Sequence, residues 1–193
     1  MTKETIVDTA ISLFQERGYN NVTVMDICNA CSITKPTFYN YVSGKESLII
    51  KIYDNIISKL LKNTYQLFSL ESSYQQLLSI FSILIEETQK YGADLFSQLF
   101  IANLNENRYS FALRDSLTQL CLSIIQKGQA NGEFLNPYDA TLLYQTIAHL
   151  FTGYETVWCI NKGESHFKKD FFASLELVLL VEEKQKNLYL QFL

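Results

Sequence analysis

Hydrophobic residues recur every three or four positions along most of the chain, which is the spacing of amphipathic α-helices. Over residues 3–17 this stripe is followed by Gly18, which is expected to end the helix in a left-handed cap. Later stripes predict further helices over residues 45–62, 73–91, 95–104, 108–130, 138–162 and 167–188. The pattern therefore predicts an all-α protein.

Two shorter helices are predicted between the first helix and residue 45. Thr23 with Asp26 three positions later resembles a capping box, and Thr34 followed by Pro36 places an N-cap and a proline in a first turn. Two short helices joined by a brief turn are typical of a helix-turn-helix unit. Further helix starts are predicted at Ser43 with Glu46, at Ser73 with Gln76, and at Asn136 with Pro137 and Asp139.

Composition narrows the class of protein. With only 7 Gly and 2 Pro in 193 residues, the chain has too few turn residues for an all-β sandwich or barrel. A 13% share of aromatic residues excludes disorder as the main state. No apolar run reaches the roughly 18 residues of a membrane-spanning helix. We therefore expect a globular helical protein without a membrane partner.

The chain has four cysteines, and whether they are reduced depends on the compartment in which the protein lies. The first residues lack the long apolar segment of a secretory signal, so we expect a cytoplasmic protein with reduced thiols. Cys28 and Cys31 form a C-x-x-C pair, but no second pair follows at a spacing that completes a zinc site. Packing between two short helices explains both side chains, and a thiol sensor is the alternative. We expect no metal and no cofactor.

Charge is distributed unevenly along the chain. The formal net charge is −4, yet residues 33–62 carry five lysines against two acidic residues. Local basic character at a helix-turn-helix unit favours DNA binding more than the acidic total opposes it. Thr34, Lys35 and Thr37 supply short polar side chains where a recognition helix enters the major groove. Tyr39 and Tyr41 reach towards phosphates, and Lys45 at a helix N-terminus predicts a phosphate clamp.

Residues 3–62 resemble the DNA-binding domain of TetR-type transcriptional regulators of bacteria. The resemblance rests on four motifs in order: A-x-x-L-F-x-x-x-G-Y from Ala10, T-V-x-D-I from Thr23, T-K-P-T-F-Y from Thr34 and K-E-x-L from Lys45. Together these motifs cover about a third of the chain. The remainder matches such regulators only in its helical plan.

The resemblance implies a three-helix DNA-binding domain over residues 1–47 and a helical ligand-binding and dimerisation domain over residues 48–193. It implies a homodimeric repressor that a small hydrophobic or aromatic effector releases from a near-palindromic operator. The DNA-binding residues it implies are Thr23, Thr34, Lys35, Pro36, Thr37, Tyr39, Asn40, Tyr41 and Lys45. Many relatives carry arginine where this chain has Met25, so one DNA contact is expected to be absent.

Two other functions stay open. One is an activator or co-regulator whose C-terminal domain binds a protein partner. The other is a helical ligand-binding module without DNA binding, which Met25 and the acidic total favour. An enzyme is not expected, because the sequence has no H-E-x-x-H or G-x-S-x-G motif and no Gly-rich phosphate loop.

Aromatic residues of the second domain belong either to the core or to an effector cavity. His149, next to Leu150 and Phe151, is expected to be a hydrogen-bonded core residue, with a ligand pocket as its alternative. Gly128 and Gly153 lie inside predicted helices, where close packing or a ligand would offset the cost of glycine. The candidate effector-binding residues are Phe96, Phe100, Tyr144, His149, Tyr154 and Trp158.

The last two predicted helices, 138–162 and 167–188, are expected to pair with their copies in a homodimer. The candidate interface residues are Val157, Phe171, Leu175, Val178 and Leu179. Each of them fits the core of the single chain equally well, because an apolar stripe does not reveal which surface covers it.

Overall fold

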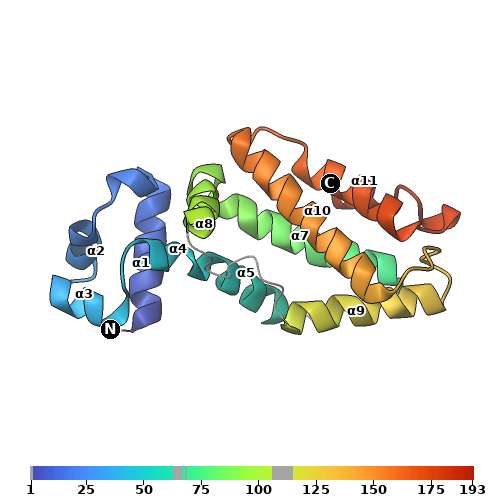
Figure 1. Cartoon of the computed structure of the whole chain (residues 1–193), viewed down its shortest axis with the longest axis horizontal. Coiled ribbons are helices and arrows are strands. Elements are labelled where there is room, and N and C mark those ends of the chain that lie inside the picture. Colours follow the sequence, from blue (N-terminus) through green and yellow to red (C-terminus); the bar gives the residue numbers. More distant parts are fainter. Residues whose placement is uncertain (1, 63–66, 68, 106–114) are drawn as a thin grey trace.

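The computed structural model describes residues 2–62, 67, 69–105 and 115–193. The described residues form ten α-helices and three short 3-10 turns, with a single isolated β-bridge, so the all-α prediction is confirmed. Three helices form a unit at one end of the molecule, and the remaining helices form a longer bundle beside it (Figure 1). The helix α4 joins the two parts.

The N-terminal unit is built from α1 (Lys3–Arg17), the turn η1 (Tyr19–Asn21), α2 (Val24–Ala30) and α3 (Lys35–Tyr41). Gly18 ends α1 with φ of 81° and ψ of 142°, so φ is positive but the conformation is not the left-handed cap that the sequence predicted. The helix α1 contacts α2 and α4, and α2 contacts α3. The fully enclosed side chains of this small core include Ile6, Ala10, Phe14, Ile27 and Phe38.

The predicted caps of the two short helices are confirmed. Thr23 Oγ1 accepts a hydrogen bond from the Asp26 amide at 3.2 Å, and the Asp26 carboxylate accepts one from the Thr23 amide at 2.8 Å. The hydrogen bonds that the Thr23 hydroxyl and the Thr23 amide donate to the Asp26 carboxylate lower the pKa of Asp26. Thr34 Oγ1 accepts from the Thr37 amide, and Pro36 lies in the first turn of α3. Local side chains thus fix both helix starts.

The long helix predicted from Lys45 is interrupted. The structure has α4 (Glu46–Ile49) and α5 (Lys51–Lys62), separated at Ile50. The predicted Ser43–Glu46 capping box is absent, because the helix starts two residues later than the box requires. The break has a packing reason: α4 contacts α1 and α8, whereas α5 contacts α7, and each piece turns its apolar side into a different neighbour.

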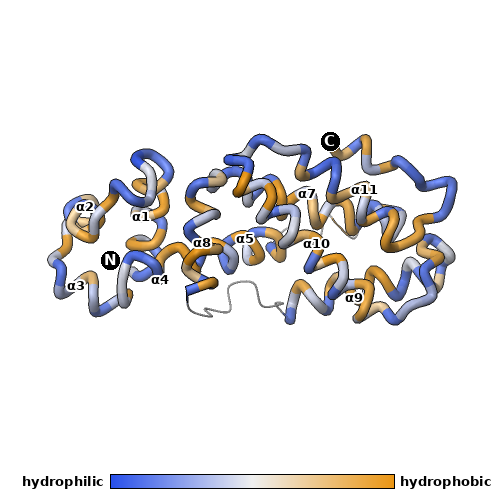
Figure 2. The backbone as a smooth tube through the Cα atoms, turned by 45° about the horizontal axis from the view of Figure 1, so that its top comes forward, coloured by the Kyte–Doolittle hydropathy of each residue, from blue (hydrophilic) through white to orange (hydrophobic). Residues whose placement is uncertain are grey.

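The C-terminal bundle comprises α7 (Ser73–Tyr91), α8 (Ala93–Asn105), α9 (Asp115–Ala130), α10 (Ala140–Ile160) and α11 (Phe167–Leu179). The helix α10 contacts α8, α9 and α11, and α7 contacts α5 and α9. In Figure 2, hydrophobic and hydrophilic stretches alternate along the bundle helices, including α10 and α11, as expected for helices that have one covered side. Rings from three helices meet in the core: Phe171 lies 4.9 Å from Phe81 and 5.2 Å from Phe151 between centroids.

Several predicted boundaries differ from the structure. The capping box of α7 is formed by Ser72 and Gln75, one residue before the predicted pair. Asp139, not Asn136, caps α10, while the Asn136 side chain donates to the Val178 carbonyl and so ties the α9–α10 connection to α11. The helix predicted over 108–130 is described from Asp115 onwards, and residues 106–114 lie outside the described part.

The helix predicted over 167–188 ends at Leu179. Leu180 adopts a left-handed conformation with φ of 50°, and the chain then pairs with the segment after α9, through Leu135 N to Leu180 O and Glu182 N to Glu133 O. The turns η2 (Glu183–Gln185) and η3 (Leu188–Phe192) complete the chain and bury Tyr189. Hydrogen bonds to a distant segment therefore override the continuing helical pattern.

Gly128 and Gly153 occupy different environments, and we expect opposite effects of alanine at the two positions. A Cβ at Gly128 would lie 2.2 Å from the ring of Phe134, which is buried, whereas a Cβ at Gly153 meets nothing within 4 Å. Gly128→Ala should lower the free energy of unfolding by about 1–3 kcal/mol. Gly153→Ala should leave it unchanged or raise it by up to about 1 kcal/mol. Urea denaturation of both variants tests this, and equal stability would contradict it.

Candidate nucleic-acid interface and effector site

The N-terminal half of α3 presents polar side chains to solvent. Thr34, Lys35 and Pro36 are exposed, and Thr37 is half-buried with its hydroxyl 2.9 Å from that of Thr34. Phe38 points the opposite way and is fully buried. The helix lies at the end of the molecule away from the bundle (Figure 1). The buried ring fixes α3 on the domain while its polar side stays accessible.

Further candidate residues continue this surface. Tyr39 and Tyr41 are 53% and 37% exposed, which is unusual for aromatic side chains that could have joined the core. Asn40 and Thr23 are exposed as well, the latter at the start of α2. Met25 is also exposed on α2, so an apolar side chain stands in this region of the surface. The structure thus leaves eight of the nine candidate DNA-binding residues exposed or partly exposed, at the start of α2 and along α3.

Lys45, the ninth candidate, is directed into the domain. Its ammonium donates to the carbonyl oxygens of Tyr19 at 2.7 Å and Val22 at 3.0 Å. It also lies 3.9 Å from the centroid of the Tyr19 ring. Burial lowers the pKa of Lys45 and raises the pKa of Tyr19 to about 12. The lysine therefore has a set of contacts within the chain that the sequence did not reveal.

The candidate effector-binding residues do not gather at one place. Phe96, Phe100 and Trp158 form a cluster in which the Phe96 ring lies 6.3 Å from that of Phe100 and 6.4 Å from that of Trp158. Tyr144 is buried near Cys121, and burial raises the pKa of its phenol. Tyr154 shares a hydrogen bond of 2.7 Å with Ser174 of α11. These side chains fill space between helices at several levels of the bundle.

His149 is exposed, so the expectation of a core histidine is wrong. It lines an open groove of about 620 Å³ on α10 together with Thr146, Leu150, Gly153, Tyr154 and Val157. Among its apolar neighbours in sequence, Phe151 is buried and Leu150 is half-buried, because successive residues of a helix point about 100° apart. A stripe of hydrophobic residues therefore says little about the histidine beside it.

Sequence reasoning missed a buried carboxyl group. Glu155 of α10 is fully enclosed and accepts hydrogen bonds from Tyr53 Oη of α5 at 2.6 Å and from Thr88 Oγ1 of α7 at 3.2 Å. Burial raises the pKa of Glu155 to about 8. The available signal was its position between Phe151 and Trp158 on the apolar side of α10. Glu155 thus joins three helices at a point where apolar residues would be expected.

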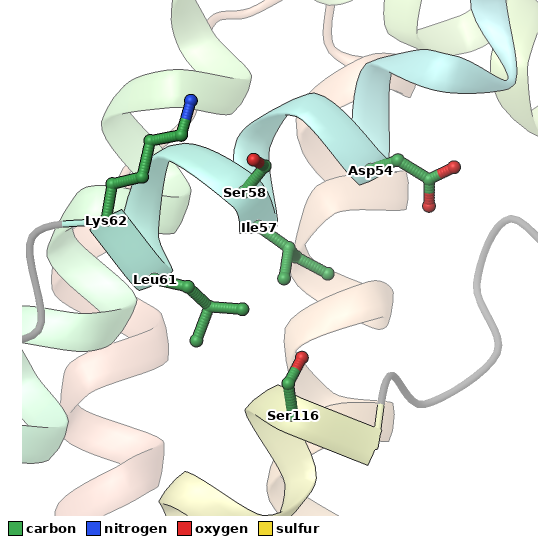
Figure 3. A pocket seen from close by; sticks show the side chains of 6 residues that line it. All are labelled: Asp54, Ile57, Ser58, Leu61, Lys62 and Ser116. Carbon is green, nitrogen blue, oxygen red and sulfur yellow. The ribbon is translucent and has the colours of Figure 1, made fainter.

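A pocket lies between α5 and the first turn of α9. It has a cavity volume of about 380 Å³ and, as Figure 3 shows, Ile57 and Leu61 of α5 face Ser116 of α9 across it. Asp54, Ser58 and Lys62 complete its described lining. A second, more polar groove of about 620 Å³ runs between α5 and α1 and shares Asp54, Ser58 and Lys62 with the pocket. None of these residues was predicted as an effector contact.

Three of the candidate dimer residues face the interior of the single chain. Phe171, Leu175 and Leu179 are completely buried, because they pack on the bundle's own aromatic core. Val157 is 48% exposed and Val178 is half-buried. Other large hydrophobic side chains stand exposed on α10 and α11: Leu142, Ile160 and Leu177. An outward apolar surface exists on these helices, but it uses different residues from most of those predicted.

The structure also bears on the cysteines, on metal binding and on membrane-spanning helices. Cys28 and Cys31 are buried in the N-terminal unit, in agreement with the packing interpretation. Within the described ranges, no group of His, Cys, Asp or Glu side chains is placed to hold a metal ion. The same part of the chain contains no helix that is long and apolar enough to cross a membrane.

The helix α3 is anchored in a three-helix unit by Phe38 while its polar side stays exposed, which is the arrangement of a helix-turn-helix DNA-binding domain. Residues 6–52 match the family described as bacterial regulatory proteins, tetR family. Over this N-terminal unit the chain carries the DNA-binding domain of the TetR family of transcriptional regulators.

Relatives and solved structures agree with this assignment. The biofilm operon icaADBC negative regulator IcaR of Staphylococcus epidermidis is 32% identical over 93 residues, 46% of this chain and 49% of that protein. The dhaKLM operon activator DhaS of Lactococcus lactis is 25% identical over 50% of this chain and 49% of that protein. The chain spans about a quarter to a half of the length of the curated relatives it matches.

Similarity of fold extends over nearly the whole chain. The structure of FadR from Thermus thermophilus, a TetR-family repressor in complex with lauroyl-CoA, superposes with a TM-score of 0.74 at 22% identity. The match covers 92% of this chain and 93% of that one. The helical C-terminal bundle is therefore the arrangement found in TetR structures, although its sequence has diverged.

Proposed function

We propose that this protein is a homodimeric repressor that leaves a near-palindromic operator when a small molecule binds its C-terminal domain. The observation that carries the proposal is the capped helix α3, whose polar side is accessible while Phe38 anchors it. This is the geometry of a recognition helix that enters a major groove by its N-terminal residues. The proposed DNA contacts on α2 and α3 are Thr23, Thr34, Lys35, Pro36, Thr37, Tyr39, Asn40 and Tyr41.

The proposed dimer forms through α10 and α11, and such a dimer would bind two half-sites. Val157, Ile160 and Leu177 are exposed there, beside the groove that contains His149 and Gly153. Exposed apolar patches of this kind commonly mark protein–protein interfaces. Two copies joined along these helices would hold two α3 helices near the roughly 34 Å repeat of successive major grooves. The interface proposed here keeps Val157 and Val178 and replaces the buried candidates.

The pocket beside α5 is the proposed effector site. Its apolar floor of Ile57 and Leu61 suits a hydrophobic molecule, and Lys62 at the rim suits a polar or anionic end. Lauroyl-CoA, the ligand in the structure of the Thermus thermophilus repressor, is a molecule that combines an apolar chain with an anionic part. Because α5 continues through Ile50 into α4, a ligand that displaces α5 would shift the equilibrium between DNA-binding and splayed arrangements.

Activation is the second candidate function. The similarity to DhaS, named as an activator, favours it as much as the similarity to IcaR favours repression. Both functions need the same DNA surface, so transcription from the bound promoter with and without the protein distinguishes them. Lower transcript levels with the protein present support repression, and higher levels support activation.

Selection of binding sites from random duplexes tests the DNA-binding surface. The wild-type chain should enrich one near-palindromic motif, and Lys35→Ala should enrich an altered motif because each lost base contact costs about 1–3 kcal/mol. Lys127→Ala, an exposed lysine change on α9, is the matched control and should return the wild-type motif. The same motif from Lys35→Ala would remove Lys35 from the proposed base contacts.

A further inference from the structure

Lys45 occupies the junction between the N-terminal unit and the helix that leads into the bundle. It directly precedes α4, and its side chain reaches back over more than twenty residues to the turn between α1 and α2. We propose that Lys45 is a positioning residue for DNA binding, which fastens this turn to α4 instead of contacting a phosphate. The proposal rests on the proposed DNA-binding function.

The contacts of the ammonium account for most of its bonding capacity. A lysine ammonium has three donors. Two of them are used on the carbonyl oxygens of Tyr19 and Val22, and the Tyr19 ring lies 3.9 Å from the nitrogen. The Phe14 ring is 5.9 Å away. Cation–π contacts and charge-assisted hydrogen bonds of this kind require the positive charge, so a neutral side chain cannot replace them.

The held turn leads directly to a proposed DNA contact. Val22, which accepts from Lys45, is followed by Thr23, the N-cap of α2. The turn η1 and the helix α4 both contact α8 of the bundle. Lys45 therefore links the start of α2 to the helix α4, which contacts the bundle. Loss of this link should misplace α2 without removing any charge from the DNA surface.

A phosphate ligand and a positioning residue leave different signatures. Removal of a phosphate contact weakens operator and non-specific binding together, and it flattens the salt dependence of affinity by about one unit of slope. Removal of a positioning contact weakens only operator binding, because non-specific binding needs charge and not exact placement. An unfolded domain would lose both kinds of binding.

The test compares the full-length wild type with Lys45→Met and Lys45→Arg. Titrations use an operator obtained by selection and a random duplex, each at several salt concentrations. Lys45→Met should lose about tenfold in operator affinity, with non-specific affinity and salt slope unchanged, which corresponds to loss of one well-placed contact. Lys45→Arg should recover most of this loss, because a guanidinium can donate to both carbonyls and lie on the Tyr19 ring.

Hydrogen exchange of the free protein gives a readout that needs no operator. Amides of residues 19–26 should exchange faster in Lys45→Met than in the wild type or Lys45→Arg, whereas Lys35→Ala should leave them unchanged. A salt slope reduced by one unit in Lys45→Met, or unchanged operator affinity and exchange, overturns the proposal. If the wild type binds no duplex, the proposed function fails while the exchange result still decides whether Lys45 holds the turn.

Discussion

Replacing Glu155 by glutamine should remove a pH dependence of stability that the wild-type protein shows between about pH 4.5 and pH 8. The carboxyl group is fully buried, and its pKa is raised from 4.5 to about 8 by that burial. The folded protein therefore keeps a proton that the unfolded chain releases in this range. Its contribution to stability is greatest below pH 4.5 and is lost as the pH rises towards 8, at about 1.4 kcal/mol per pH unit.

Urea denaturation at several pH values measures this effect. The free energy of unfolding of Glu155→Gln should gain on that of the wild type as the pH is raised from 5 to 7, and the gap should stop growing above pH 8. Glu164→Gln, a change at an exposed carboxylate, is the control and should follow the wild type. Parallel curves for wild type and Glu155→Gln would show that Glu155 is ionised in the folded protein.

The same carboxyl group connects the bundle to the helix that leads to the DNA-binding unit. Tyr53, which donates to Glu155, belongs to α5, and its ring lies 5.8 Å from that of Phe96 on α8. Replacement of Glu155 by an apolar residue would remove this hydrogen bond, although the burial of a carboxyl group is itself costly. The free-energy cost of burying this carboxyl group indicates that Glu155 is not optimised for stability alone.

Val157→Glu should convert the protein from dimers to monomers if α10 and α11 form the proposed interface. Val157 is 48% exposed in the single chain, so the substitution should not disturb folding, but a carboxylate would be buried between two copies. Operator affinity should fall by about a hundredfold or more, because two half-sites would no longer be bound by one linked pair. Light scattering measures the mass, and DNA titration measures the affinity.

Two further substitutions, both of leucines, distinguish loss of the interface from loss of the fold. Leu104→Glu on α8, at an 85% exposed position, should leave the mass unchanged. Leu175→Glu should prevent folding, since Leu175 is completely buried in the single chain. A Val157→Glu variant that keeps twice the monomer mass would place the interface elsewhere.

The elements that the sequence predicted well are those fixed by near neighbours. Thr23 and Asp26, or Thr34 and Pro36, act within one helical turn, so their caps follow from a few adjacent letters. The break at Ile50 and the end of α11 at Leu179 depend on segments far along the chain, and periodicity alone did not reveal them.

The candidate sites show the same division between local and distant determinants. An apolar stripe predicted that Leu175 and Val157 are covered, but not whether by the same chain or by a partner, and the two residues differ in this respect. Glu155 was overlooked because a lone acidic residue in an apolar stripe is read as part of the polar side. The contacts of Lys45 needed the turn at Tyr19 to be placed beside α4, which only the folded chain does.

Two measurements on one complex test the central claim most directly. They are the mass of the complex between the protein and selected DNA, and the sequence of that DNA. The proposed function predicts that two chains bind one duplex whose two half-sites are related by a dyad, with centres about one helical turn of roughly 10 base pairs, or a multiple of it, apart. One chain bound to a single half-site, or a selection that enriches no sequence, would contradict it.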